Sequence, residues 1–240
     1  MAKLVLDTSA WLDLAKLRFS EVLTELEEQI ASGGTVLLVS QIIKDEWARN
    51  KERVINDTMQ SIRSHARSAL TMAELLEKQD SDQLTAIAEK YRTIEAAQRV
   101  LAEKFAERLE KLIDSATVYP IKDELKIEMA DRAVAKLAPF HNSKNNMADA
   151  LLYFGAVAYV REHTEIANDL IFVTSNSKEF NDPDHPLEIH PDLKRPFVHF
   201  NNNVANALQM RKEVIDEMDE YHEYKFWSWI EQEADIARGK

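Results

Sequence analysis

Residues 4–9 read Leu-Val-Leu-Asp-Thr-Ser, a short apolar run that ends in a carboxylate followed by two hydroxyl side chains. Apolar runs of this length are typical of buried strands, although a buried helix can have the same composition. If the run is a central parallel strand, Asp7 stands at its carboxyl end, where open α/β sheets place their ligand sites. A charge buried there is costly unless it is paired or binds a metal. The stretch therefore predicts a site at one sheet edge, provided that other carboxylates reach the same edge.

The composition is that of a globular protein and excludes several kinds of site. The chain has 240 residues, enough for one or two domains, with 45% hydrophobic and 30% charged residues. It has no cysteine, which excludes disulfides and thiolate metal sites. Neither GxGxxG nor GxxxxGK[ST] occurs, which argues against Gly-rich phosphate loops. The net charge of −12 argues against a broad nucleic-acid footprint, but an acidic metal site with a local basic face is compatible with it.

Two observations concern location. No run approaches the ~18 apolar residues that a membrane span requires. Residues 1–3 lead straight into the apolar run and leave no room for a signal peptide. We therefore expect a cytoplasmic protein without membrane association.

The first half of the chain predicts a βαβ unit followed by a helical insert. Apolar residues recur at helical spacing over 11–30, and residues 35–40 read as a second buried strand. Two further helical stripes, over 55–76 and 84–112, are separated by the polar segment 78–82, with an N-cap expected at Ser81 or Asp82. They predict an antiparallel helical hairpin over 50–115, inserted into the main body, with arms of about 45 Å.

The second half returns to the main body. We expect helices over 123–138 and 147–161, a third buried strand over 170–174, an irregular loop over 181–196 and a last short strand over 196–200. From residue 204 onward the chain reads as an acidic helix that ends in aromatic residues. The fold class is therefore α/β, an αβα sandwich with a central, mainly parallel sheet. The domain organisation is a single domain over 1–240, with the hairpin at 50–115 and a C-terminal helical extension at 203–238.

Three carboxylates follow or precede elements that should converge at one sheet edge. They are Asp7, Glu46 and Asp149. A carboxylate cluster can hold Mg²⁺ or Mn²⁺ through oxygen ligands and water. Each acid also has an ordinary structural explanation: Asp7 as a turn residue or helix N-cap, and the other two as first-turn acids that suit a helix dipole. Asp45 competes with its neighbour Glu46.

The segments around these acids resemble the PIN-domain nuclease family. The opening Val5-Leu6-Asp7-Thr8-Ser9-Ala10 is similar to the family's first-strand motif, and Glu46 matches the acid in the helix after the second strand. Met147–Leu152 is similar to its D-A-L-I motif, and Phe172–Phe180 resembles its T-x-D-x-x-F segment. The resemblance covers residues 1–50 and roughly 120–200. It is greatest to a bacterial PIN-like subfamily with a long helical insert.

The resemblance implies a Mg²⁺- or Mn²⁺-dependent endonuclease, usually acting on RNA, with a toxin or defence role by family association. It implies metal ligation by Asp7, Glu46 and Asp149, and site-supporting hydroxyls at Ser9 and Thr174. The fourth catalytic position departs from the family pattern, because it holds Asn176 where the family carries an acid. Asn176 offers at most a neutral ligand, so we expect weaker binding of a second metal unless an acid in the adjacent turn, Glu179 or Asp182, supplies the charge.

A basic bias marks the start of the insert. We predict nucleic-acid contacts from the Lys and Arg side chains that follow the second strand, although a solvated helix face gives the same pattern; they are Lys44, Arg49, Lys51 and Arg53. The insert or the C-terminal helix could also bind an inhibitor protein or a second copy of the chain.

Two other functions compete with a nuclease. A phosphatase of the haloacid-dehalogenase type also begins with a strand-end Asp, but it needs a second Asp two residues later, where this chain has Ser9. A PIN-like nucleic-acid or protein binding module that has lost its chemistry is supported by Asn176 and opposed by the three acids.

Overall fold

Five parallel strands form the centre of the molecule in a computed structural model, which describes residues 2–141, 146–163, 169–185 and 188–210. The strands are β1 (Ala2–Leu6), β2 (Thr35–Val39), β3 (Thr117–Val118), β4 (Leu170–Val173) and β5 (Val198–Asn201). Their order in the sheet is β3-β2-β1-β4-β5, and all four pairings are parallel. The predicted α/β class with a parallel central sheet is therefore confirmed.

The inner strands are mainly apolar, as is typical of a parallel sheet with both faces covered. Successive side chains point to opposite faces of a strand. Leu4 and Leu6 accordingly pack into one core, with α1, α2, α3 and α5, while Val5 packs into a second core against α7. The first strand is thus buried from both sides, which makes its terminal carboxylate a buried one.

The helices on the first face do not form one continuous segment after β1. The chain makes α1 (Thr8–Leu14), a 3₁₀ turn η1 (Leu17–Phe19) and α2 (Ser20–Ala31). The sequence predicts a single helical stripe over 11–30, and that prediction is wrong at residues 15–19. Apolar residues on both sides of the corner are buried in the same core, so the helical spacing continues across it.

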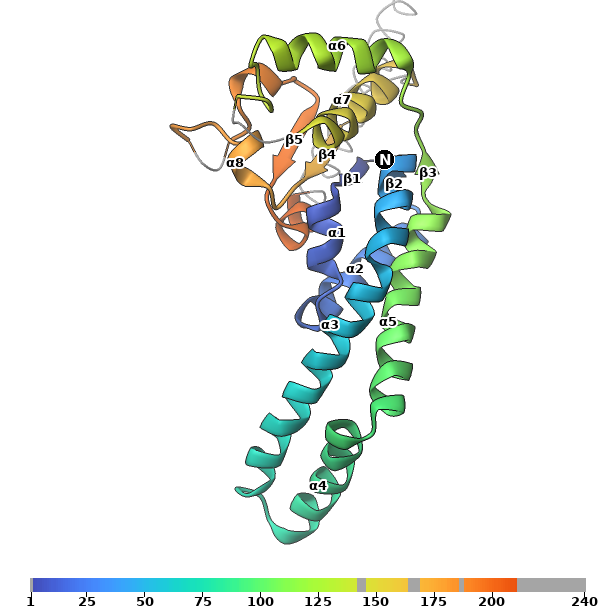
Figure 1. Cartoon of the computed structure of the whole chain (residues 1–240), viewed down its shortest axis with the longest axis vertical. Coiled ribbons are helices and arrows are strands. Elements are labelled where there is room, and N and C mark those ends of the chain that lie inside the picture. Colours follow the sequence, from blue (N-terminus) through green and yellow to red (C-terminus); the bar gives the residue numbers. More distant parts are fainter. Residues whose placement is uncertain (1, 142–145, 164–168, 186–187, 211–240) are drawn as a thin grey trace, which may run out of the picture.

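The insert is a long helical arm, as predicted, but its second half is divided. α3 (Gln41–Ala73) has 33 residues, about 50 Å at 1.5 Å per residue. α4 (Lys78–Thr93) packs on its far end and α5 (Glu95–Ser115) runs back alongside it (Figure 1). α4 starts at Lys78, so Ser81 and Asp82 lie inside the helix rather than at its N-cap. The return arm breaks at Ile94, whose extended backbone separates α4 from α5.

The helices α6 (Asp123–Val134) and α7 (Met147–Glu162) cover the second face of the sheet, at the end of the molecule opposite the arm (Figure 1). α7 is apolar on nearly all sides, and its middle, Ala150 to Val157, is buried. α6 ends at Val134, before the predicted end at residue 138, and Lys136 just beyond it takes a left-handed conformation with φ of 53°. That conformation is typical of a residue that terminates a helix.

The remaining elements are short. α8 (Ser177–Phe180) follows β4, and a 3₁₀ turn η2 (Pro191–Leu193) precedes β5. β3 was not predicted, because two exposed residues carry no periodic signal. A helix begins at residue 204, as expected, and the rest of the predicted C-terminal extension, 211–238, lies outside the described residues. Within the described ranges, no helix is both long and apolar enough to cross a bilayer.

Candidate active site

The predicted site edge lies where the strand order reverses. β1 is the central strand, with β2 on one side and β4 on the other. Ligands of open α/β sheets bind outside the carboxyl ends of the strands at such a switch point. β1 and β4 end in register, with Leu6 opposite Val173, and the backbone N–H of Asp7 donates to the Val173 carbonyl at 2.9 Å. The residues that follow the two strands are therefore neighbours.

The Asp7 carboxylate is buried, with 1% of the residue exposed, and it is held by three donors. Oδ1 accepts from the Ser9 hydroxyl and from the backbone N–H of Ala10, both at 2.8 Å. Oδ2 accepts from the Thr174 hydroxyl. The Ala10 contact makes Asp7 the N-cap of α1, so the structural explanation for this acid holds. Capping does not require the hydroxyl contacts from Ser9 and Thr174, which restrict the orientation of the carboxylate further.

Burial raises the pKa of Asp7 to about 7, against the lowering effect of the hydrogen bonds from Thr174, Ala10 and Ser9. The negative charge of Asp149 raises this pKa further. Two acids whose charges repel at a buried position are an arrangement that a cation would stabilise.

Asp149 lies in the first turn of α7 and is joined to the predicted fourth position. The side-chain amide of Asn176 donates to Asp149 Oδ2 at 3.1 Å. The backbone N–H of Asn176 donates to the Thr174 hydroxyl at 2.9 Å. Thr174 thus connects Asp7 on one side with Asn176 and Asp149 on the other.

Glu46 reaches the same edge from the second turn of α3. The Thr8 hydroxyl, from the residue next to Asp7, donates to Glu46 Oε2. Asp45, the competing neighbour, is exposed and accepts from Gln41 at 2.8 Å. The geometry therefore favours Glu46 over Asp45 as the acid associated with Asp7.

Glu179 and Asp182, the two acids that the sequence offers as substitutes at the fourth position, lie in different environments. Glu179 is buried within α8, with 1% exposed. Asp182 accepts from the backbone N–H of Asp184 at 2.9 Å and lies 3.4 Å from His185, so it belongs to its own turn. The side chain that contacts Asp149 is the neutral Asn176.

Sequence reasoning missed a hydroxyl network beneath the acids. The backbone N–H of Ser175 donates to the Ser9 hydroxyl at 2.9 Å, and the Ser175 hydroxyl donates to Asp13 Oδ2 at 2.5 Å. Asp13 also accepts from Lys16. The network ties α1 to the residues after β4. The available signal was the pair of hydroxyls after Asp7, together with Thr174 and Ser175 after the other strand.

The four predicted basic contacts separate into two groups. Lys51 Nζ lies 2.7 Å from Glu110, and Lys44 Nζ lies 3.8 Å from Asp114, so both face acids on α5. Arg49 lies 3.8 Å from Glu46, within one helical turn of the proposed site. Arg53, one further turn along α3, lines a groove between α3 and the segment after α1.

The donor set fits a hard divalent cation through a pair of acids. Among residues 2–141, 146–163, 169–185 and 188–210, no three His, Asp or Glu side chains are grouped closely enough to hold a metal ion. Mg²⁺, however, usually keeps several waters and is bound by only one or two carboxylates. Asp7 and Asp149 supply such a pair, since hydrogen bonds through Thr174 and Asn176 link them and the charge of Asp149 acts on Asp7. Glu46 and Asn176 flank it through Thr8 and Asp149 respectively.

Comparison with known proteins identifies the family of the chain but does not bear on the roles of single residues. No curated protein and no solved structure matches the chain. A family model described as a PIN domain matches residues 4–180, which include β1, the whole helical insert, α7 and β4. The match spans well over half of the chain, and the three acids and Asn176 all fall within it. The chain belongs to the PIN domain family, whose members are generally nucleases.

Proposed function

We propose that this protein is a metal-dependent endoribonuclease with its active site at the carboxyl ends of β1 and β4. The observation that carries the proposal is the Asp7 carboxylate, which is buried, fixed by three donors and within electrostatic reach of Asp149. Capping of α1 accounts for the Ala10 contact but not for the hydroxyl contacts that link Asp7 through Thr174 and Asn176 to Asp149. PIN domain membership implies a nucleic-acid substrate and supports divalent-metal chemistry.

The three acids divide into two proposed roles. Asp7 and Asp149 would hold the cation, and Glu46, fixed by Thr8, would hold a proton taken from the attacking water. When bound, a divalent cation supplies charge stabilisation to the phosphoryl oxygens and activates water for in-line displacement. Ser9 and Thr174 would keep the Asp7 carboxylate in one orientation, so that little reorganisation accompanies the reaction.

The test is cleavage of a panel of single-stranded and structured RNA and DNA substrates with Mg²⁺ or Mn²⁺. We expect RNA cleavage that EDTA abolishes and that Asp7→Asn and Asp149→Asn each reduce by at least about a thousandfold. The matched control is Asp123→Asn, an exposed acid on α6. Equal cleavage by wild type and both site variants would overturn the proposal.

A second readout does not depend on activity. Ligands that bind only the folded state raise its thermal stability. Mn²⁺ should therefore raise the melting temperature of the wild type and of Asp123→Asn, but not of Asp7→Asn or Asp149→Asn. Equal stabilisation of all four proteins would place the metal elsewhere.

A catalytically attenuated binding module is the alternative, and Asn176 favours it. A neutral amide beside Asp149 lowers the negative charge at the site by one relative to an acid. In that case the protein should bind RNA without metal-dependent cleavage, and Asn176→Asp should produce cleavage. A toxin or defence role requires that expression of the wild type arrests growth of the host cells. Expression of Asp7→Asn, the control, should leave growth unchanged.

The arm could also carry a protein partner. Apolar side chains predicted to be buried along the second stripe are exposed towards its far end, including Ile87, at 58%, and Ile94. Leu75 is a further exposed apolar side chain of the arm, and such residues are where we place contact with an inhibitor protein or a second copy of the chain. Light scattering at several concentrations, on wild type and on Leu75→Ser/Ile87→Ser, tests self-association; a wild type that stays monomeric would rule out a second copy as the partner.

A further inference from the structure

We propose that the groove between α3 and the segment after α1, the α1–α3 groove, holds the phosphate backbone of one nucleic-acid strand beside the cleavage site. The α1–α3 groove has a volume of about 520 Å³. Its lining comes from two stretches of chain, residues 12–18 and residues 53–61. The inference names the substrate form for the proposed nuclease and rests on that proposal for the position of the cut.

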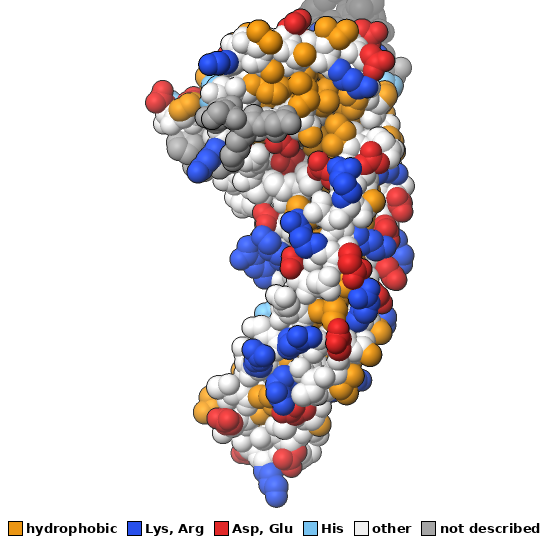
Figure 2. Space-filling model, in the orientation of Figure 1, with side chains coloured by type: hydrophobic (Ala, Val, Ile, Leu, Met, Phe, Trp, Pro, Cys, Tyr) orange, Lys and Arg blue, Asp and Glu red, His pale blue; other side chains and the backbone are white. Residues whose placement is uncertain are grey.

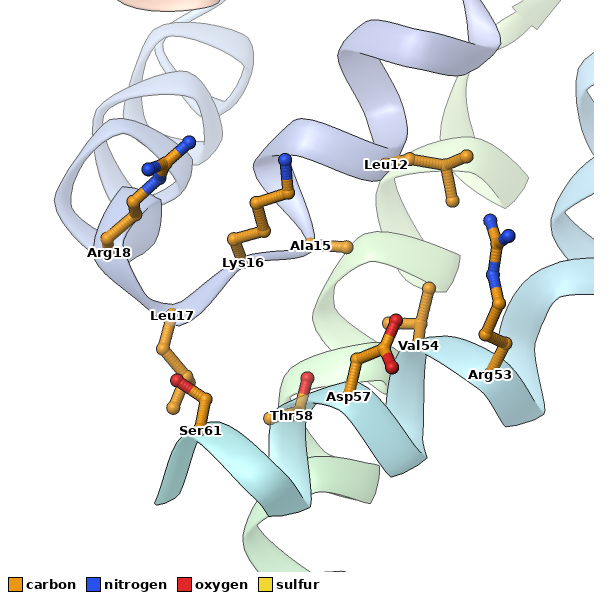
Figure 3. A pocket seen from close by; sticks show the side chains of 10 residues that line it. All are labelled: Leu12, Ala15, Lys16, Leu17, Arg18, Arg53, Val54, Asp57, Thr58 and Ser61. Carbon is orange, nitrogen blue, oxygen red and sulfur yellow. The ribbon is translucent and has the colours of Figure 1, made fainter. Parts of the chain in front are cut away.

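The groove combines an apolar floor with cationic walls. Leu12, Leu17 and Val54 contribute apolar surface. Figure 3 shows Lys16 and Arg18 on one wall and Arg53 on the other, with their side chains extending in the same direction. Such a lining suits a strand whose phosphates contact the cations while its sugars and bases contact the apolar residues.

The charge of this lining is opposite to that of the whole chain. The chain carries 42 acidic and 30 basic residues. The α1–α3 groove is lined by three cations, Lys16, Arg18 and Arg53, and one acid, Asp57, a local excess of two positive charges. Figure 2 shows Lys and Arg side chains gathered on this face at the level of α1 and the upper part of α3. An anionic ligand is the class that such an excess favours.

The two arginines are available for phosphate. Arg18 and Arg53 form no ion pair with a residue in the described ranges, and both are exposed. Arg18 instead lies 4.8 Å from the Phe19 ring centroid. Lys16 pairs with Asp13, an exposed contact of the kind that contributes little stability and that a phosphate can replace.

The groove continues from the acid site. Arg53 follows Glu46 by seven residues, two turns or about 10 Å along α3. Leu12 follows Thr8 by one turn on α1, and these two residues line a small cavity that also contains Glu46. A strand lying in the α1–α3 groove would therefore reach the acids within a few nucleotides.

The dimensions favour a single strand over a duplex. A volume of about 520 Å³ lies in the range of cavities that take one small ligand, which corresponds to about one nucleotide. An RNA double helix is A-form and carries two backbones around its stacked base pairs, which a cavity of this volume does not hold. We therefore assign the α1–α3 groove to a single strand, which under the proposed function is single-stranded RNA or the single-stranded part of a structured RNA.

The experiment measures binding without cleavage. Fluorescence anisotropy of labelled single-stranded RNA is titrated with the full chain in EDTA, over a range of salt concentrations. The groove variant is Lys16→Gln/Arg18→Gln/Arg53→Gln, and the charge-matched control is Lys78→Gln/Lys104→Gln/Lys111→Gln on exposed helix surfaces of α4 and α5. Parallel arms use single-stranded DNA and an RNA duplex of the same sequence.

We expect the groove variant to bind RNA about tenfold to a hundredfold more weakly at 0.1 M salt, and its salt slope to fall by about 2, at about 0.7 per lost phosphate contact. The control should bind as the wild type does. Equal RNA affinity and equal salt slope for wild type and groove variant would overturn the assignment of the α1–α3 groove as an RNA-binding site, whether or not the protein cleaves RNA. Tighter binding of the duplex would overturn the assignment to a single strand. If the wild type binds RNA but cleaves none, and the groove variant loses that binding, the groove assignment would stand and only the proposed nuclease activity would be refuted.

Discussion

The side-chain amide of Asn176 donates a hydrogen bond of 3.1 Å to Asp149 Oδ2. This contact joins the residues after β4 to the first turn of α7, at the position where the PIN resemblance implies a fourth acid. The amide thus donates to a carboxylate whose negative charge raises the pKa of Asp7, and it links the residues after β4 to α7.

Asn176→Asp should replace the hydrogen bond to Asp149 by repulsion between two carboxylates, which a bound cation would relieve. Removing a hydrogen bond to a charged group and adding a like charge costs about 2 kcal/mol. At about 2–4 °C per kcal/mol for a chain of this size, we expect the variant to melt about 4–8 °C below wild type in EDTA. Mn²⁺ should recover most of that difference. Asn206→Asp, which adds the same charge at an exposed position, is the control. A variant as stable as wild type in EDTA would contradict the proposed repulsion.

Asp7 should make the metal-free protein less stable as the pH rises. Its pKa is about 7 in the folded state, against an ordinary value of 3.8. The folded state therefore binds more protons than the unfolded chain between about pH 4 and pH 7, and the free energy of unfolding falls across this window. At about 1.4 kcal/mol per pH unit, the fall from Asp7 is at most about 4 kcal/mol.

The measurement is urea denaturation in EDTA from pH 4.5 to 7.5, compared between wild type and Asp7→Asn. The difference between the two curves isolates Asp7, because the other titrating groups are common to both. We expect the variant to lack the decline, whereas Asp123→Asn should retain it. Parallel curves for wild type and Asp7→Asn would mean that Asp7 is ionised throughout the window.

Thr8→Val should impair catalysis while leaving RNA binding intact. The substitution removes the hydroxyl that donates to Glu46 but keeps the shape of the side chain. A hydrogen bond to a charged group contributes about 1.5 kcal/mol, which corresponds to about a tenfold lower kcat. Thr71→Val, which removes a hydroxyl bonded within α3 far from the site, is the matched control. A fall in affinity with unchanged kcat would assign Thr8 to the substrate rather than to Glu46.

The sheet edge could be predicted because its determinants are local. An apolar run that ends in a charge defines β1 and Asp7, and parallel topology alone brings the residues after β4 to the same edge. The pairing of Thr8 with Glu46 spans 38 residues and depends on how α3 sits on α1, which no local pattern encodes.

The basic residues illustrate what a local stretch of sequence cannot specify, namely which partners other helices bring to a side chain. Lys44 and Lys51 looked equivalent to Arg53, but their partners Asp114 and Glu110 come from α5 and depend on the register of the arm. The α1–α3 groove was likewise hidden, because Lys16 and Arg18 lie in the corner after α1, within a stripe whose helical spacing continues unbroken.

Gln98 should be the residue that fixes the far half of the arm. The residue is 1% exposed, and its amide donates to the carbonyls of Tyr91 and Arg92 at 2.7 and 3.2 Å, across the break at Ile94. Its oxygen accepts two hydrogen bonds from the Arg63 guanidinium, at 3.1 and 2.7 Å. One side chain thus joins the end of α4, the start of α5 and the middle of α3.

Gln98→Met keeps the approximate volume and removes all four contacts, leaving the Arg63 guanidinium unpaired. We expect the free energy of unfolding to fall by about 2 kcal/mol. The effect should be concentrated in α4, because the lost contacts hold the end of this helix to α3 and α5. Limited proteolysis with chymotrypsin should cut after Tyr91 much faster than in wild type, while RNA cleavage by the intact fraction stays unchanged. Gln83→Met, at an exposed position of α4, should cut at the wild-type rate. If Gln98→Met also cut at that rate, the arm would be held together by its apolar contacts alone.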